Sequence, residues 1–100
     1  MRRQGRESAL LARIMRALGA LPGIVVRKRH GSAWGVAGDP DLYGSIHGRH
    51  FEIEVKSGDQ KPTLLQQARL KQWAATGALV GVAHSVEEAL RLVSPGRGSR

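Results

Sequence analysis

The sequence contains no cysteine and few aromatic residues, which account for 4% of the chain. The absence of cysteine excludes a disulfide scaffold and a cysteine-ligated zinc site. No apolar run approaches the about 20 residues that span a membrane. The apolar stretch near the N-terminus is interrupted by Arg13 and Arg16, unlike a secretory signal. We therefore expect a soluble, cytoplasmic protein without a membrane partner, whose core consists of Leu, Val, Ile and Ala.

Acidic residues are also scarce. The chain has 8 Asp and Glu against 16 Lys and Arg, which gives a formal charge of +8. Such a balance favours a polyanionic partner, usually nucleic acid or an anionic membrane surface. The length of 100 residues fits one domain over residues 1–100. We expect a basic N-terminal arm over about 1–6 and a flexible tail over about 95–100. Both ends either contact the partner or are simply solvated.

The hydrophobic pattern predicts an α/β fold with the element order αβββαβα. The expected helices cover 7–18, 63–76 and 86–93, and the expected strands cover 23–30, 41–47, 50–57 and 78–83. Thr63 and Gln66 have the spacing of a capping box, and Ser85 is the expected N-cap of the last helix. The second and third strands form a hairpin. A helical crossover then leads to an apolar strand that we expect to be parallel to its neighbour and buried on both faces.

The hairpin gathers acidic residues on one face. If Gly48 and Arg49 form the turn, then Tyr43 faces Glu54 and Asp41 faces Lys56. Asp41 would then lie diagonally beside Glu54, with about 5–8 Å between their Cβ atoms. The opposite face is apolar and should pack on the core; it carries Leu42, Ile46, Phe51, Ile53 and Val55.

Two neighbouring carboxylates repel each other unless a cation lies between them. Mg²⁺ suits such a pair because it prefers a few oxygen ligands and retains several waters, and the Val55 carbonyl could add a ligand. Lys56 could orient an attacking water or hold a phosphate oxygen. Asp-Pro-Asp alone is usually a turn, and Glu-x-Lys alone is usually a solvated strand face. Their combination in a basic chain favours cleavage of a phosphodiester.

These motifs resemble the PD-(D/E)XK nuclease superfamily, with Pro40-Asp41 as "PD" and Glu54-Val55-Lys56 as "ExK". The chain is most similar to stand-alone VRR-NUC domains of phages and prophages, in which Gly-x-Pro-Asp, Glu-x-Lys and Ser/Thr-x-x-Gln follow in this order. Here the last motif is Thr63 to Gln66. The resemblance covers nearly the whole chain.

The resemblance implies a restriction-endonuclease-like fold, dependence on Mg²⁺ or Mn²⁺, and hydrolysis of DNA. Asp41 and Glu54 would hold the metal, Lys56 would position water, and Gln66 would assist nearby. Glu7 is the candidate for an acidic metal ligand on the first helix, or simply complements the helix dipole. Similar stand-alone proteins are homodimeric Holliday-junction resolvases, so the implied partners are branched, four-way DNA and a second copy of the chain.

Further residues are candidates for contacts with DNA. Arg27, Lys28, Arg29 and Lys61 are the candidates for phosphate contacts, and Trp34 could stack on an unpaired base or anchor its loop. We expect His47 and His50 to face solvent beside the hairpin turn. Tyr43 lies on the acidic face. Trp73 is more typical of a core or dimer-interface residue.

The sequence thus predicts a metal-dependent, structure-selective endonuclease, foremost a Holliday-junction resolvase. A sequence-specific restriction-type nuclease is a second enzyme hypothesis, although 100 residues leave little room for a separate recognition element. A non-catalytic nucleic-acid-binding module, or a basic ribosome-associated protein, would bind nucleic acid without cutting it.

Overall fold

The computed structural model describes residues 3–31 and 35–94, with the side chains of residues 3 and 4 excepted. Its elements are α1 (Arg3–Gly19), β1 (Ile24–Lys28), β2 (Leu42–Ile46), β3 (Arg49–Val55), α2 (Leu64–Ala74), β4 (Leu79–Ala83) and α3 (Val86–Val93). The predicted element order is confirmed. Helix α1 begins four residues before its expected start at Glu7, so residues 3–6 of the expected arm are helical.

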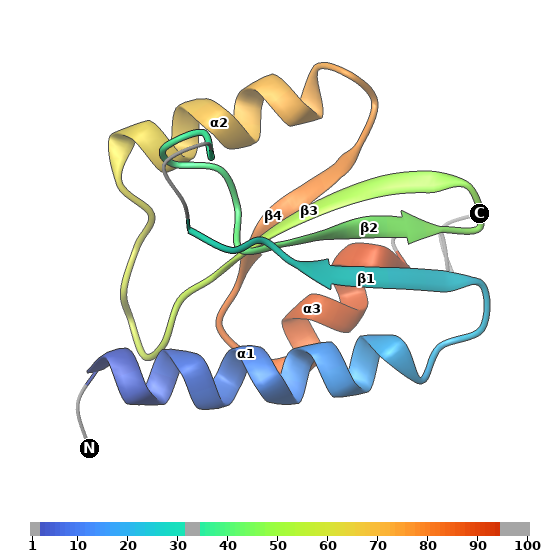
Figure 1. The fold of residues 1–100 in the computed structure, drawn as a ribbon, viewed down its shortest axis with the longest axis horizontal. Coiled ribbons are helices and arrows are strands. Elements are labelled where there is room, and N and C mark those ends of the chain that lie inside the picture. Colours follow the sequence, from blue (N-terminus) through green and yellow to red (C-terminus); the bar gives the residue numbers. More distant parts are fainter. Residues whose placement is uncertain (1–2, 32–34, 95–100) are drawn as a thin grey trace.

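The four strands form one mixed sheet in the order β1-β2-β3-β4 (Figure 1). β1 and β3 each pair antiparallel with β2, whereas β4 pairs parallel with β3. The expected parallel crossover through α2 is therefore confirmed. The expectation that β4 is buried on both faces is wrong, because β4 lies at a sheet edge and only its last residue, Ala83, is buried.

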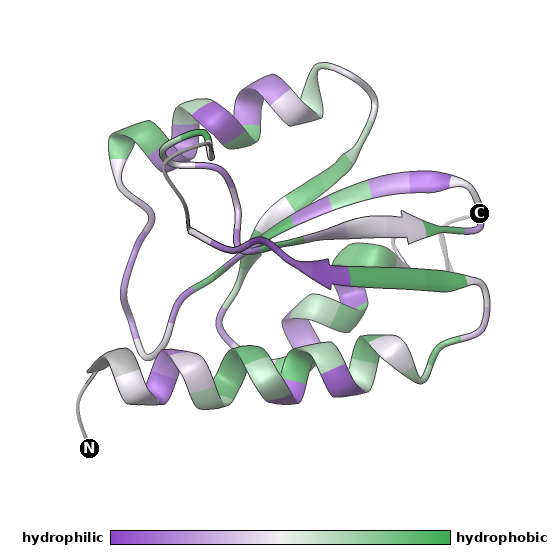
Figure 2. Ribbon diagram, in the orientation of Figure 1, coloured by the Kyte–Doolittle hydropathy of each residue, from purple (hydrophilic) through white to green (hydrophobic). Residues whose placement is uncertain are grey.

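Helices cover both faces of the sheet. α1 and α3 lie on one face and contact each other, and α2 lies on the other (Figure 1). α1 buries Leu10, Ile14 and Leu18, which recur every fourth residue and therefore share one side of the helix. They pack with the predicted apolar face of the hairpin, all of whose members are buried: Leu42, Ile46, Phe51, Ile53 and Val55. Figure 2 shows hydrophobic and hydrophilic residues alternating along α1, as expected for a helix with one buried side.

The hairpin turn lies one residue earlier than predicted. Tyr43 faces Glu52 and Ile46 faces Arg49, so His47 and Gly48 form the turn. Both have positive φ, 48° and 83°, as a type I′ turn requires, and glycine is favoured at the second of its two positions. The shift changes which residues face each other across the hairpin. Each residue's partner on the other strand moves by two positions, and side chains alternate between faces, so the predicted residues stay on each face.

Helix α2 is capped as predicted. Thr63 Oγ1 accepts a hydrogen bond from the Gln66 N–H, and Gln66 Oε1 accepts one from the Thr63 N–H, at 3.1 and 2.9 Å. The helix buries none of its residues. Polar contacts join it to the segment before β2, since Arg69 Nε donates to the Ala37 carbonyl at 2.9 Å. No helix in the described part of the chain has the length and apolar character needed to cross a membrane.

Candidate active site

Asp41 and Glu54 meet where the hairpin strands begin to separate. Asp41 immediately precedes β2, and continuing the β2–β3 register by one position places it opposite Glu54. The Val55 N–H donates to Asp41 Oδ2 at 2.9 Å, which fixes the Asp41 side chain against β3. β3 has a partner strand on each side, so Glu54 is held on the middle of the sheet. Asp41 and Glu54 are thus direct cross-strand neighbours, whereas the sequence predicted a diagonal pair.

Glu54 is an unusual carboxyl group, because it is only 2% exposed. Burial foremost, and then the negative charge of Asp41, raise its pKa to about 7 against the opposing effect of Lys56. Lys56 Nζ lies 3.5 Å from Glu54 Oε2. The other oxygen, Oε1, is buried and has no hydrogen-bond partner. The positive charge of Lys56 is therefore not enough to offset the burial of an ionised Glu54 and its repulsion by Asp41.

The donor set fits a hard divalent cation. A cation beside Glu54 would satisfy the unpaired Oε1 and remove the repulsion between the two carboxylates. In residues 3–31 and 35–94, no group of three or more His, Asp or Glu side chains could hold a metal ion by itself. A pair of carboxylates suits Mg²⁺ or Mn²⁺ rather than Zn²⁺, because Mg²⁺ keeps several waters and needs one or two protein carboxylates.

A cavity of about 230 Å³ opens beside Asp41 between α1 and the ends of β1 and β3. It is lined by Glu7, Ser8, Leu11, Lys28, Asp41 and Val55. Folding therefore brings Glu7 and Lys28, which are far from Asp41 in sequence, to the same opening. Glu7 is half-buried and Lys28 is exposed. This position is compatible with the predicted roles of Glu7 toward a metal and of Lys28 toward a phosphate.

Lys56 and Gln66 differ in how closely they join the site. The Lys56 side chain is 15% exposed and points to Glu54, so its ammonium group shares the site with the carboxylates. The Gln66 side-chain carbonyl is engaged with the Thr63 N–H at the start of α2. The predicted assisting role of Gln66 would therefore rely on its side-chain NH₂ group or on release of the cap.

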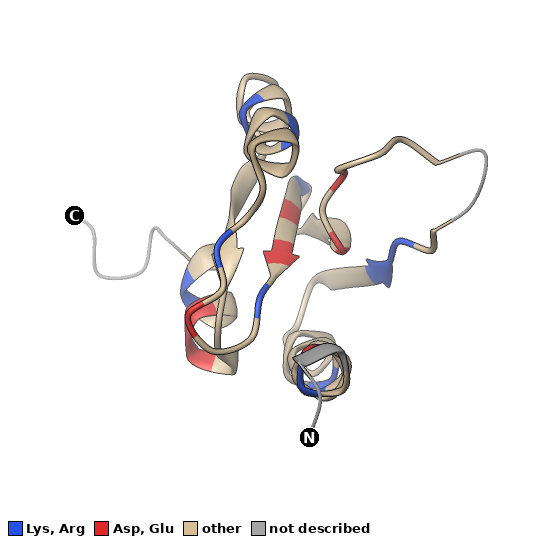
Figure 3. Ribbon diagram, turned by 90° about the vertical axis from the view of Figure 1, so that its left-hand side faces the viewer, with Lys and Arg blue, Asp and Glu red and all other residues tan. Residues whose placement is uncertain are grey.

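The structure describes four of the five residues that were predicted to contact DNA. Arg27 and Lys28 are exposed at the end of β1, and Lys61 is exposed in the loop before α2. Figure 3 shows basic residues at the end of β1, on the helices and in the loops around the acidic stretch of β3. Trp34 lies outside the described residues. Arg29 is not free for a phosphate in the way that the sequence predicted, because its guanidinium pairs with Glu52.

The sequence reasoning missed the role of Glu52. This carboxylate has no exposed surface, and Arg29 Nη1 and Nη2 donate to its two oxygens at 2.8 and 3.2 Å. His50 Nε2 lies 2.7 Å from Glu52 Oε2 while the His50 side chain is 40% exposed, so His50 faces solvent as expected but also contacts a buried carboxylate. The available signal was the position of Glu52 in the centre of a core strand, where a charge needs a partner.

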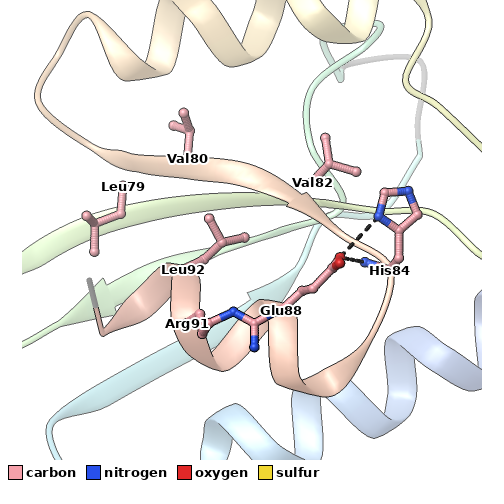
Figure 4. Close-up of a pocket in the computed structure, with 7 residues that line it drawn as sticks. All are labelled: Leu79, Val80, Val82, His84, Glu88, Arg91 and Leu92. Carbon is pink, nitrogen blue, oxygen red and sulfur yellow. Dashed lines mark hydrogen bonds and ion pairs between the residues drawn. The ribbon is translucent and has the colours of Figure 1, made fainter. Parts of the chain in front are cut away.

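A separate pocket of about 520 Å³ lies beside β4 and α3 (Figure 4). It contains none of the predicted site residues. Its carboxylate, Glu88, accepts hydrogen bonds from the His84 N–H at 2.6 Å and from Nδ1 at 3.1 Å. These hydrogen bonds, the backbone one foremost, lower the pKa of Glu88. A carboxylate held in this way is a poor general base, so this pocket is not the candidate active site.

Comparisons with known proteins agree with the motifs. No family model matches the sequence, and no curated protein matches it. A solved structure named "VRR_NUC domain" superposes with a TM-score of 0.72 at 28% identity, covering 89% of this chain and 95% of the other. A second, named "VRR_NUC domain protein", has a TM-score of 0.73 at 21% identity and shows the same fold over 90% of this chain and 86% of the other. Fold, motif order and these similarities together support a VRR-NUC domain, a nuclease domain of the PD-(D/E)XK type, in this chain.

Proposed function

We propose that this protein is a metal-dependent, structure-selective DNA endonuclease, foremost a Holliday-junction resolvase that acts as a homodimer. The observation that carries the proposal is the buried Glu54 carboxylate, which has one oxygen without a partner beside Asp41 and Lys56. A binding module has no need for a carboxylate pair with excess negative charge near phosphate. A phosphodiester hydrolase needs such a pair to hold a divalent cation.

Each residue of the site has a task in this reaction. Asp41 and Glu54 would hold Mg²⁺ or Mn²⁺ with the Val55 carbonyl, and Glu7 is a further candidate ligand across the cavity. The bound metal would act as a Lewis acid toward the phosphate and lower the pKa of water. Lys56, beside Glu54, would orient the attacking water or hold a phosphate oxygen. Gln66 would assist from the start of α2.

The basic surroundings would hold the DNA backbone. Lys28 lines the same cavity as Asp41, so a phosphate that it binds there would lie near the Asp41 carboxylate. Arg27 and Lys61 are exposed and would extend the contact along the strand, together with Trp34 and the remainder of the +8 charge. The resemblance to phage and prophage domains favours action in the cytoplasm of a bacterial or phage-infected cell.

Two copies are needed to cut a four-way junction symmetrically. The edge strand β4 supports this part of the proposal, because its residues 79–82 are half-exposed although they are Leu, Val, Gly and Val. Such a strand presents unpaired backbone groups and apolar side chains, which a second copy can cover. Sedimentation equilibrium at the concentration used for cleavage tests this. A monomer that makes single nicks would refute the dimeric resolvase.

The decisive experiment compares a labelled four-way junction with a linear duplex of the same arm sequence. Each is incubated with Mg²⁺, Mn²⁺ or EDTA. Lys56→Ala removes the candidate water-positioning group, and Lys71→Ala is the matched control, since Lys71 is exposed on α2. We expect paired, metal-dependent cuts in the junction that persist in Lys71→Ala and disappear in Lys56→Ala.

Other outcomes identify the alternatives. Cuts at one sequence in the linear duplex would indicate a restriction-type nuclease. Metal-independent binding without cleavage would refute catalysis and leave a nucleic-acid-binding module.

A further inference from the structure

A buried ion pair on β3 is joined to the segment that carries Asp41. Glu52 and Glu54 lie on the same face of β3, two residues apart. Glu52 has no exposed surface, and each of its oxygens accepts a hydrogen bond from Arg29. His50 supplies a further contact to Oε2 at 2.7 Å. Unlike Glu54, Glu52 therefore has both oxygens satisfied and no capacity to take a cation.

Arg29 also holds the turn before β2. Its Nη1 donates to the Pro40 carbonyl at 2.6 Å, and its backbone N–H donates to the Asp41 carbonyl at 2.7 Å. The guanidinium lies over the Tyr43 ring, with Cζ 4.5 Å from the ring centroid. One residue thus binds two successive carbonyl groups of the Pro-Asp motif while its charge is fixed by Glu52.

Helix α2 reaches the same turn. Trp73 Nε1 donates to Asp39 Oδ1 at 3.2 Å, and the Trp73 ring lies against His50 with 5.1 Å between ring centroids. The turn is therefore held at Asp39 from α2 and at Pro40 and Asp41 from Arg29. These contacts leave the main chain before Asp41 little freedom to rotate.

We infer that Arg29 and Glu52 are positioning residues, which hold the 39–41 turn so that the Asp41 carboxylate faces Glu54 in the geometry that a divalent cation requires. A buried ion pair contributes little net stability compared with an apolar pair of similar volume. Its value here is geometric, because the two guanidinium nitrogens bond both oxygens of Glu52 while Nη1 also bonds the Pro40 carbonyl, a planar arrangement that the single nitrogen of a lysine does not reproduce. Groups that orient metal ligands typically affect affinity by about 10–100-fold. This inference rests on the proposed metal site.

The test uses Mn²⁺ affinity, measured by the electron-paramagnetic-resonance signal of free Mn²⁺, on the full chain without DNA. The variants are Glu52→Gln, Arg29→Lys, and Arg29→Met combined with Glu52→Gln. The double variant leaves no unpaired buried charge and is the one designed to remain folded. Glu88→Gln is the control, because it removes a His84 contact away from the site. Circular dichroism reports the folded fraction of each protein.

We expect the folded variants to bind Mn²⁺ about 10–100-fold more weakly than the wild type, and Glu88→Gln to bind it normally. On DNA, kcat should fall while KM changes little. A purely structural role would lower the melting temperature without changing the Mn²⁺ affinity of the folded protein, and that result would overturn the inference. Unfolding of all three variants would also overturn it. A wild type that binds no Mn²⁺ would instead refute the proposed function.

Discussion

Replacing Glu54 by glutamine should stabilise the metal-free protein while removing a ligand of the proposed metal site. Burial and the charge of Asp41 raise the pKa of Glu54 from 4.5 to about 7. Each pKa unit corresponds to about 1.4 kcal/mol, so an ionised Glu54 lowers the free energy of unfolding by roughly 3 kcal/mol at pH 8. Glutamine carries no charge, but it loses the contact with Lys56 at 3.5 Å. We therefore expect a net gain of about 1–2 kcal/mol.

The sign of the pH dependence follows from the raised pKa. The folded protein retains the Glu54 proton up to about pH 7, whereas the unfolded chain loses it near 4.5. The stability from this proton is fully present below pH 4.5 and is lost as the pH rises through about 7. Wild type and Glu54→Gln should therefore be similarly stable at low pH, and the variant should gain its advantage between these two values.

Thermal unfolding in EDTA, followed by circular dichroism, measures this difference. For a domain of this size, a gain of 1–2 kcal/mol raises the melting temperature by about 5–15 °C. Saturating Mn²⁺ should reverse the order, because only the wild type is stabilised by binding. A Glu54→Gln protein that is less stable than the wild type at pH 8 in EDTA, or a difference that does not change with pH, would refute the reasoning.

Three further predictions concern the site and its support. Mn²⁺ affinity, measured by titration calorimetry, should rise about tenfold per pH unit below pH 7 and then level off, because binding displaces the Glu54 proton; a flat profile would contradict this. Gly44→Ala should abolish folding as judged by circular dichroism, because its Cβ would lie 1.8 Å from the Val25 carbonyl oxygen, whereas Gly31→Ala, with nothing within 4 Å, should be tolerated. Thr63→Ala should lower the free energy of unfolding by about 1 kcal/mol in urea denaturation through loss of the α2 cap, and an unchanged value would show that the cap contributes nothing.

The element order could be predicted because each element carries its own local signal. Leu10, Ile14 and Leu18 repeat at helical spacing, and Thr63 and Gln66 form the predicted capping box. The faces of the hairpin could be predicted as well, since burying an alternating apolar set leaves one choice of face. The turn was harder to place. A register shift of two residues keeps the faces, so only the preference for glycine at the second turn position distinguishes His47-Gly48 from Gly48-Arg49.

The candidate site, like the fold, could be predicted from the sequence only in part. The proximity of Asp41 and Glu54 follows from the hairpin and could be predicted. The pairing of Arg29 with Glu52 could not, because a basic residue after a strand looks the same in sequence whether it faces phosphate or a buried carboxylate. The location of Glu7 beside Asp41 depends on how α1 crosses the sheet, and nothing local in the sequence determines that packing.

The absence of buried residues in α2 has a consequence for the cooperativity of unfolding. β3 is hydrogen-bonded on both sides and holds Glu54, whereas α2 adds little to the core and is joined to the rest by contacts such as Arg69 to Ala37. Local opening of α2 should therefore require much less free energy than opening of β3. Amide hydrogen exchange should be fast in the helix and close to the global limit in the strand. Local opening of α2 would release the Trp73 contact to Asp39 but would leave Arg29 bonded to Pro40 and Glu52, so the segment that carries Asp41 keeps its main anchor.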